Sequence, residues 1–222
     1  LAALVDTLDA SSVKTITSAT AGSVAEALAI VEDANVTITG SISAANASLI
    51  AKETTGVLTA TITGDTAANL LGALGDTNTS DILALTVTDG VASKIVALLE
   101  KTGGKIKVDA TAVTGTIEDL TSIYVTNKAK FEGLGNEAVT ISGDGVSAAQ
   151  LNAIAAATTG KVTATLSSDT PLNAATVTAL KDVKTSDNIT FVAAAGSLTD
   201  KADMNALLAI KKIIPNAIHF LM

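Results

Sequence analysis

The chain has 222 residues and a formal net charge of −8, from 14 basic and 22 acidic side chains, with no Cys and no Trp. The lack of Cys excludes a disulfide framework, a thiolate metal site and a cysteine nucleophile. Every basic residue is Lys, and the acidic balance provides no basic stripe for nucleic acid. Mean hydropathy is high, +0.48, but no apolar run approaches the roughly 20 residues of a membrane-spanning helix. We therefore expect neither a nucleic-acid partner nor a membrane span.

In chain order, residues 1–8 form a short amphipathic piece, and eight runs of alternating apolar and β-branched residues then predict strands. In residues 58–62 the alternation places Leu and Ile inward and the threonines outward. The predicted strands are residues 13–17, 36–39, 58–63, 83–88, 106–114, 139–142, 162–167 and 189–193.

A helix start follows each predicted strand. Ser147 with Gln150, and Ser23 with Glu26, match the capping box, in which each residue satisfies a backbone amide of the other. Apolar residues then recur at helical spacing, and glycines such as Gly160 end the helical stretches. The chain therefore alternates between strand and helix.

The sequence also repeats itself with an offset close to 104 residues. One register held over some fifty residues indicates an internal duplication, inside which a strand–turn–helix unit of about 22–28 residues recurs. The matched segments are 36–40 with 139–143, 54–62 with 158–166, and 79–81 with 185–187.

A strand and a helix in about 25 residues cannot bury a core of their own, so such units must stack in parallel. We therefore predict an α/β fold, a parallel α/β solenoid of about eight coils in a single elongated domain. The predicted parts are 1–11 as the end of a preceding helix, 12–106 as the first long repeat, 107–216 as the second, and 217–222 as the start of a further strand. Within this scheme, residues 127–133 are interpreted as a solvated connector, with a hinge or a lateral contact as the alternative.

The strand–turn–helix period resembles the architecture of leucine-rich-repeat solenoids, although the strict Leu/Asn consensus of that family is absent. The Ala-, Thr-, Gly- and Asp-rich, Arg-poor and Cys-free repeats, with Thr-Thr-Gly turns at 54–56 and 158–160, also resemble repeat arrays of very large secreted bacterial proteins. These are surface-layer, adhesin and motility-associated proteins of marine bacteria and cyanobacteria. The resemblance implies an extracellular, cell-surface structural or adhesive role without catalytic residues.

We predict no catalytic and no cofactor-binding residues. The only His, His219, lies in an apolar run and is interpreted as an outward residue of a final strand. Glu118 and Asp119 fall in a first helical turn, where acids favour the helix dipole, and no nucleophile-elbow, dinucleotide or phosphate-loop motif occurs. The parts that catalysis needs are missing, so we expect that the protein is not an enzyme.

Asp144 and Asp169 are the candidate metal ligands. Each follows the inward apolar residue of its strand by three positions, as Asp65 does, and neighbouring strands lie about 4.8 Å apart. Two carboxylates that close repel unless they are solvated, protonated or bridged, and calcium with its oxygen ligands would bridge them. The alternative is that these residues start turns and cap helices in water.

Threonines in the pattern Thr-x-Thr mark the outward strand face. Stacked in parallel they would form a grid of hydroxyl and methyl groups, which resembles the surface of some ice-binding solenoids; ordinary exposed strand threonine is the alternative. The candidate binding-face residues are Thr37, Thr39, Thr59, Thr61, Thr63, Thr86, Thr88, Thr163 and Thr165.

The sequence thus predicts a non-catalytic structural or adhesive scaffold of a cell-surface, filament or surface-layer protein. The alternative is a ligand-binding module whose Thr-rich face engages a carbohydrate, a protein or ice. Residues 1–8 and 217–222 do not resemble the polar caps that solenoid ends need. The expected partners are therefore copies of the chain or further repeats of a longer one, with surface glycans as a further candidate.

If Asp144 and Asp169 share a calcium ion, millimolar calcium should raise the melting temperature, and Asp169→Asn should abolish the gain because it removes one charged ligand. Thermal melts with calcium and with chelator measure this. Identical melts under both conditions would favour the solvated alternative.

Overall fold

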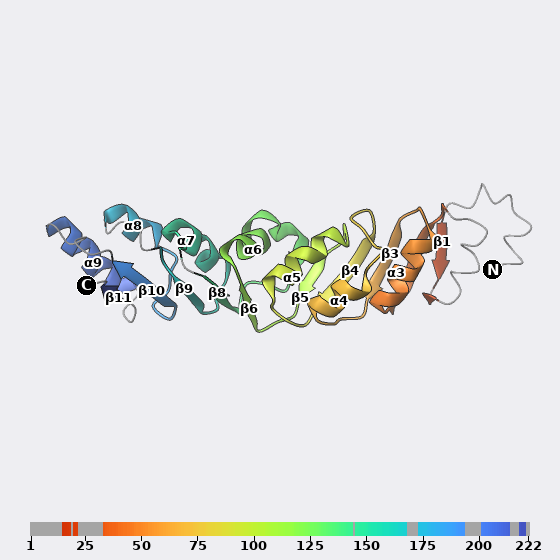
Figure 1. The fold of residues 1–222 in the computed structure, drawn as a ribbon, viewed down its shortest axis with the longest axis horizontal. Helices are drawn as coiled ribbons and strands as arrows, with labels where there is room; N and C mark the ends of the chain where they lie inside the picture. Colours follow the sequence, from red (N-terminus) through yellow and green to blue (C-terminus); the bar gives the residue numbers. More distant parts are fainter. Residues whose placement is uncertain are drawn as a thin grey trace, which may run out of the picture. The chain divides into compact units, whose positions relative to one another are not determined.

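The computed structural model describes residues 15–18, 20–21, 33–143, 145–167, 173–193, 201–213 and 218–220, without the side chains of 192–193 and 218–220. Figure 1 shows the helices and strands along the chain, which divides into two compact units. Unit 1 comprises residues 1–89, 94–109 and 129–133, and unit 2 comprises residues 90–93, 110–128 and 134–222. Each unit is therefore assembled from separated stretches of the chain.

Unit 1 contains a six-stranded sheet in the order β1-β2-β3-β4-β5-β7, in which every neighbouring pair is parallel. Its strands are β1 (Thr15–Ser18), β2 (Asn35–Ile42), β3 (Leu58–Ile62), β4 (Ile82–Val87), β5 (Ile106–Val108) and β7 (Phe131–Glu132). The connecting helices are α3 (Ala44–Glu53), α4 (Ala67–Ala73), α5 (Ala92–Ala97), which begins in residues of unit 2, and the short turns η3 (Leu98–Glu100) and η5 (Lys128–Lys130).

Unit 2 contains a five-stranded, likewise parallel sheet in the order β11-β10-β9-β8-β6. Its strands are β6 (Ala112–Gly115), β8 (Ala138–Ile141), β9 (Val162–Thr165), β10 (Asn188–Ala193) and β11 (Ile218–Phe220). Its helices are α6 (Ile117–Thr121), the π-helical turn η4 (Ser122–Thr126), α7 (Ala148–Ala157), α8 (Ala174–Ala179) and α9 (Lys201–Ile213). The predicted α/β fold with parallel strands is confirmed, but the strands form two sheets in two compact units where a single elongated domain was predicted.

Seven of the eight predicted strands lie where the alternation placed them, with ends that differ by at most three residues; residues 13 and 14 of the first lie outside the described residues. The prediction of one strand over residues 106–114 is wrong, because β5 and β6 belong to different sheets. Ile106, Val108 and Val113 are all buried, and the odd spacing between Val108 and Val113 cannot put both on one face of a continuous strand.

The interpretation of residues 127–133 as a solvated connector holds only in part: residues 128–130 are exposed, but the segment also contains the strand β7. Phe131 pairs with Ile106 across β7 and β5, and it is only 7% exposed. Lys105 donates to the Ala129 carbonyl oxygen over 2.6 Å, and Lys130 donates to the Gly103 carbonyl oxygen over 2.7 Å. This segment therefore adds a strand to the sheet of unit 1.

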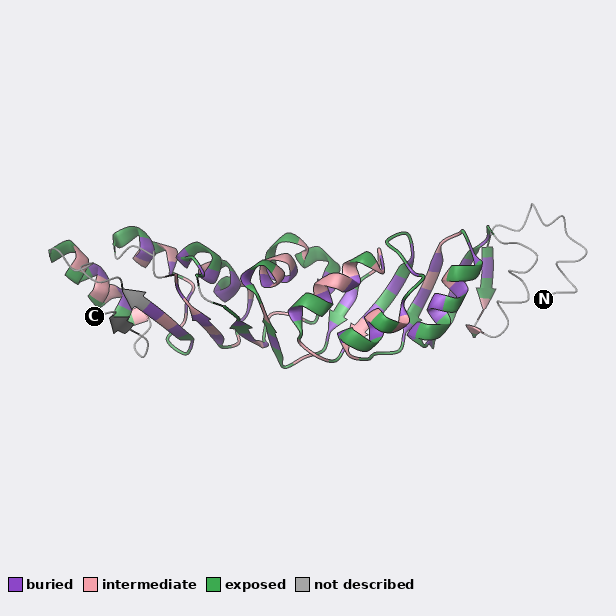
Figure 2. Ribbon diagram, viewed as in Figure 1, coloured by how far each residue is buried: buried purple, intermediate pink, exposed green. Residues whose placement is uncertain are grey.

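The inward and outward faces follow the predicted alternation (Figure 2). The inward residues Leu58 and Ile62 in unit 1, and Val162 and Leu166 in unit 2, are at most 2% exposed. Helices supply the other wall of each core, where the apolar sides of α3 and α4 in unit 1, and of α7 in unit 2, are buried. Burial of these apolar side chains is the main favourable term for short coils of this kind.

The helix starts carry the expected caps. Ser147 and Gln150 form the predicted capping box, and Ser43 caps α3 at the equivalent position of the first repeat. The second predicted box, Ser23 with Glu26, lies outside the described residues. Capping contributes about 1 kcal/mol per helix, which matters for helices of five to ten residues that are too short to be stable alone.

Because Ile62 and Leu166 occupy equivalent inward positions, Ile62→Ala and Leu166→Ala should each lower the free energy of unfolding by about 2–5 kcal/mol. The outward neighbours give matched controls, since Thr61→Ala and Thr165→Ala should each change it by less than about 0.5 kcal/mol. Chemical denaturation measures all four. Equal losses at inward and outward positions would contradict this assignment of the faces.

Candidate functional site

The outward threonines form rows in register across neighbouring strands. In unit 1, Thr17 pairs with Thr37 and Thr37 with Thr59, and the next strand continues the row with Ile82. In unit 2, a second row joins Thr114, Thr140, Thr163 and Asn188. No candidate binding-face threonine is buried, and each is either exposed or half-buried.

The row in unit 1 is less regular than the row in unit 2. The pairing of β2 with β3 shifts between Thr37 and Ser41, and Thr86 pairs with the charged Lys107. Thr39 donates to the Ser18 carbonyl oxygen, and Thr63 shares a hydrogen bond with Ser41. By contrast, the hydroxyls of the threonine row in unit 2 make no hydrogen bond to the described part of the protein.

The candidate metal ligands Asp144 and Asp169 lie outside the described residues. Asp65, which has the same sequence position in its coil, accepts hydrogen bonds from the Asn69 side chain over 2.9 Å and from the Thr66 amide over 2.7 Å. The Asn69 bond, followed by the Thr66 bond, holds the pKa of Asp65 below its ordinary value. Among the described residues, no group of three or more His, Cys, Asp or Glu side chains could hold a metal ion.

The other polar residues singled out in the sequence have local roles or are not described. Glu118 and Asp119 lie in the first turn of α6, as predicted. The backbone of His219 lies in β11, but its side chain is not described.

Buried threonines, two of which begin the Thr-Thr-Gly turns seen in the sequence, join neighbouring strand–helix segments. Thr54 donates to the Ala34 carbonyl oxygen over 2.6 Å, and its hydroxyl accepts from the Gly56 amide over 3.0 Å. Thr158 repeats this arrangement in unit 2, donating to the Glu137 carbonyl oxygen and accepting from the Gly160 amide. We call this arrangement the Thr-x-Gly clamp.

Thr102 forms the same clamp within unit 1, toward the carbonyl oxygens of Asp81 and Leu83 and from the Gly104 amide. The glycine is required because the chains approach closely: a Cβ at Gly160 would lie 2.0 Å from the Glu137 carbonyl oxygen. Any side chain there would have to displace the neighbouring strand.

Buried carboxylates join the alternate coils. Asp81, 2% exposed, accepts from the amides of Leu58 and Asn78, each over 3.0 Å. Asp187, 6% exposed, accepts in the same way from the amides of Val162 and Lys184, each over 2.8 Å. Each carboxylate thereby satisfies the first amide of the preceding strand, which would otherwise lack a partner. We call this arrangement the Asp clamp.

The helix layer is joined in a similar way. The Ser48 hydroxyl on α3 donates to the Asp76 carboxylate over 3.1 Å and accepts from the Asp76 amide over 2.9 Å. In unit 2, Asn152 on α7 forms the corresponding reciprocal pair with Asp182, over 2.8 and 2.7 Å. The two internal repeats therefore preserve this contact together with the clamps.

One buried pair occurs only in unit 2. Tyr124, 3% exposed, donates to the carboxylate of Glu137, which also accepts from the amides of Gly135 and Asn136. Burial, followed by the hydrogen bond and the charge of Glu137, raises the pKa of Tyr124 far above its ordinary value. The hydroxyl is therefore a permanent hydrogen-bond donor at neutral pH.

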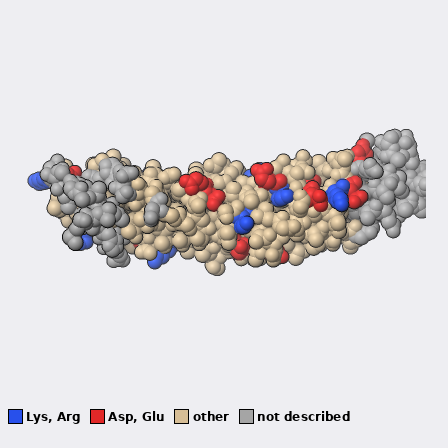
Figure 3. Space-filling model, in the orientation of Figure 1, with Lys and Arg blue, Asp and Glu red and all other residues tan. Residues whose placement is uncertain are grey.

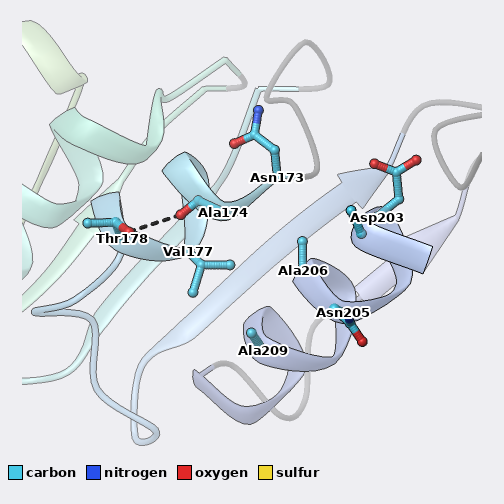
Figure 4. Close-up of a pocket in the computed structure, with 9 residues that line it drawn as sticks. Asn173, Ala174, Val177, Thr178, Asp203, Asn205, Ala206 and Ala209 are labelled. Carbon is cyan, nitrogen blue, oxygen red and sulfur yellow. Dashed lines mark hydrogen bonds between the residues drawn. The ribbon is translucent and has the colours of Figure 1, made fainter. Parts of the chain in front are cut away.

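A groove of about 450 Å³ lies between α8 and α9 in unit 2 (Figure 4). Ala174 and Val177 of α8 line it together with Ala206 and Ala209 of α9. Two of its polar groups already serve α8: Asn173 caps the helix, and Thr178 donates to the Ala174 carbonyl oxygen over 2.9 Å. Asp203 and Asn205 of α9 also line the groove, and Asp203 is the single titratable side chain among the described lining residues. The groove therefore provides largely apolar surface and no acid–base pair.

Charged groups are sparse among the described residues, and on the face shown in Figure 3 they lie in small scattered groups. Lys105 with Glu132, and Lys107 with Asp109, form exposed ion pairs of 3.9 and 3.8 Å in unit 1. No described helix is long and apolar enough to cross a membrane. No protein-family model, curated protein or solved structure matches the chain.

Replacing Asp81 by Ala should lower the free energy of unfolding by about 1–3 kcal/mol, because the buried Leu58 amide loses its acceptor. Asp81→Asn keeps the shape and one carbonyl oxygen, so it should cost less. Asp109→Ala, which removes only an exposed ion pair, should cost less than about 1 kcal/mol. Denaturant unfolding compares the three, and an equal cost for Asp81→Ala and Asp109→Ala would rule out the clamp.

Tyr124 is the only Tyr in a chain without Trp, so phenolate absorbance reports on it alone. The pKa of Tyr124 is raised in the folded chain, so above the ordinary tyrosine pKa of about 10 only the unfolded chain releases the proton. The free energy of unfolding should therefore keep its full value below about pH 10 and fall as the pH rises above it. Phenolate should therefore appear together with the loss of circular dichroism. Glu137→Gln, which removes the facing charge, should let it appear at a lower pH.

Titration of wild-type Tyr124 near pH 10 with unchanged circular dichroism would contradict its placement.

Proposed function

We propose that the chain is a non-catalytic scaffold of an extracellular, cell-surface protein, built as a parallel α/β solenoid of about eight stacked coils. The observation that carries this proposal is that the Thr-x-Gly and Asp clamps join neighbouring strand–helix coils from β2 to β5 and from β8 to β10, and so recur in both internal repeats. Stability made of nearest-neighbour contacts is typical of solenoids, whose length can change without loss of fold.

The clamps also indicate a repeating module of two coils. The position in question lies two residues before the first inward residue of each strand. For β2 and β4 it holds the residue whose carbonyl oxygen accepts the threonine hydroxyl, Ala34 or Asp81. For β3 and β5 it holds the clamp glycine, Gly56 or Gly104. Asp81 thus occupies in β4 the place that Ala34 occupies in β2. A chain that can gain or lose such modules is suited to act as a spacer, because the number of modules sets its length.

Buried polar side chains support a structural role. The hydroxyls of Thr54, Thr102 and Thr158 donate hydrogen bonds to backbone carbonyl oxygens. The carboxylates of Asp81 and Asp187 accept hydrogen bonds from backbone amides. None of these groups faces a cavity with an acid–base partner, as catalysis requires. The extracellular location rests on the resemblance to secreted bacterial repeat proteins.

Deleting one module tests the architecture. Removing residues 34–80 joins Asp33 to Asp81, which places Asp81 where Ala34 stood, so the shortened chain should fold, with a circular dichroism spectrum like that of the parent. The out-of-phase control removes a single coil, residues 34–55, which joins Asp33 to Gly56 and so places a clamp glycine where the clamped Ala34 stood; this chain should not fold like the parent. If both deletions unfold the chain, the solenoid proposal fails.

Antibodies against the chain should label intact cells of its source organism. Labelling only after permeabilisation would overturn the proposed surface location. Light scattering across a dilution series should show self-association if copies of the chain are its partners.

A second function, ligand binding on the outward sheet face, is favoured by one separate observation. Matched outward positions of β2 and β8, and of β3 and β9, carry Thr in both internal repeats: Thr37 with Thr140, Thr59 with Thr163, and Thr61 with Thr165. Carbohydrate, protein and ice are the ligand classes to be separated.

A further inference from the structure

The internal duplication compares two copies of the same surface within one chain. Five outward positions in and directly after the paired strands carry Thr or Ser in both copies. They are Thr37 with Thr140, Thr39 with Ser142, Thr59 with Thr163, Thr61 with Thr165, and Thr63 with Ser167.

The exposed side of the helix layer has not been preserved in the same way. Leu49, Lys52 and Glu53 of α3 correspond to alanines in α7, at positions 153, 156 and 157. Strand propensity alone does not require hydroxyls, since Val, Ile and aromatic residues satisfy it equally. The outward sheet face therefore retains a chemistry that the fold does not demand.

Unit 2 displays this chemistry most regularly. Thr114, Thr140 and Thr163 lie directly opposite one another on β6, β8 and β9, and Thr165 lies opposite Thr190 on β10. Neighbours in a row are separated by the strand spacing of about 4.7–4.9 Å, and successive outward residues on one strand by about 6.6 Å. Because these hydroxyls bond to nothing in the described part of the protein, they are available to a ligand.

The chemistry of the face selects an uncharged, periodic partner. The paired rows themselves carry no carboxylate or ammonium group, so they do not suit a charged surface, although the exposed Lys161 stands two positions before Thr163. Sugar-binding faces commonly use aromatic side chains as stacking platforms, but the aromatic side chains that the structure describes, Tyr124, Phe131 and Phe191, are buried. A partner built from small donors and acceptors that repeat at the strand spacing fits better.

We propose that this hydroxyl face of unit 2 binds the surface of ice. Water in ice presents uncharged donors and acceptors at a regular spacing close to that between strands, and each threonine offers one hydroxyl to the lattice and one methyl that excludes liquid water. The inference rests on the second proposed function, ligand binding by the sheet face, and is independent of the solenoid proposal.

The test uses the purified 222-residue chain and ice itself. Thermal hysteresis and ice-recrystallisation assays should show activity in the wild type, and the double variant Thr140→Lys with Thr163→Lys should reduce it at least about tenfold. The matched control is Ala153→Lys with Ala156→Lys, which places the same charges on the exposed side of α7 and should leave activity unchanged. Melting temperatures of both variants report folding separately from ice activity.

The outcomes separate the two claims. Absence of ice activity in the folded wild type overturns the inference. If the wild type instead sediments with cellulose or chitin and only the threonine variant loses this, the face is a ligand site whose ligand is not ice. If neither ice nor polysaccharide is bound, both the inference and the proposed ligand-binding function fail, and the module-deletion experiment still decides the scaffold.

Discussion

The structure depends on how a parallel strand begins. The first backbone amide of a strand can be buried at a point where the regular hydrogen bonds between strands have not yet begun. A buried amide without an acceptor costs about as much free energy as a lost hydrogen bond. Here the next coil supplies the acceptor, through the carboxylate of Asp81 to Leu58 and of Asp187 to Val162. The same need explains why short polar residues lie in the core of so apolar a protein.

The clamps also determine which residues can stand beside them. A strand whose first carbonyl receives a threonine hydroxyl approaches its neighbour so closely that only glycine fits, as at Gly56 and Gly160. Hydrogen bonding and close packing are therefore two effects of one arrangement, and the Thr-x-Gly pattern is its sequence signature. Inward apolar residues supply most of the stabilisation, while the clamps fix the register between coils.

Features that follow from a periodic pattern, such as the inward and outward faces of a strand, could be predicted from the sequence. Contacts between segments that are distant in the sequence could not. Alternation over residues 58–62 gave the correct faces because a strand has a period of two. Phe131–Glu132 is too short to alternate, so its pairing with β5 was missed. Asp81 reads as a turn residue, since only the position of the Leu58 amide reveals its partner. The internal repeat matched Asp81 with Asp187, but it did not show that both carboxylates accept the first amide of the preceding strand.

The interleaving of the two units has a consequence for synthesis on the ribosome. The sheet of unit 1 is complete only when Phe131–Glu132 pairs with β5, and β5 is made first, together with the whole of β6 and α6. At translation rates of about 5–20 residues per second, the edge of β5 waits about 1–5 s for its partner. During that interval its backbone groups are open to other strands. Lys107 lies in β5 and Lys105 directly before it, and charged lysines along an exposed strand edge disfavour pairing with another chain.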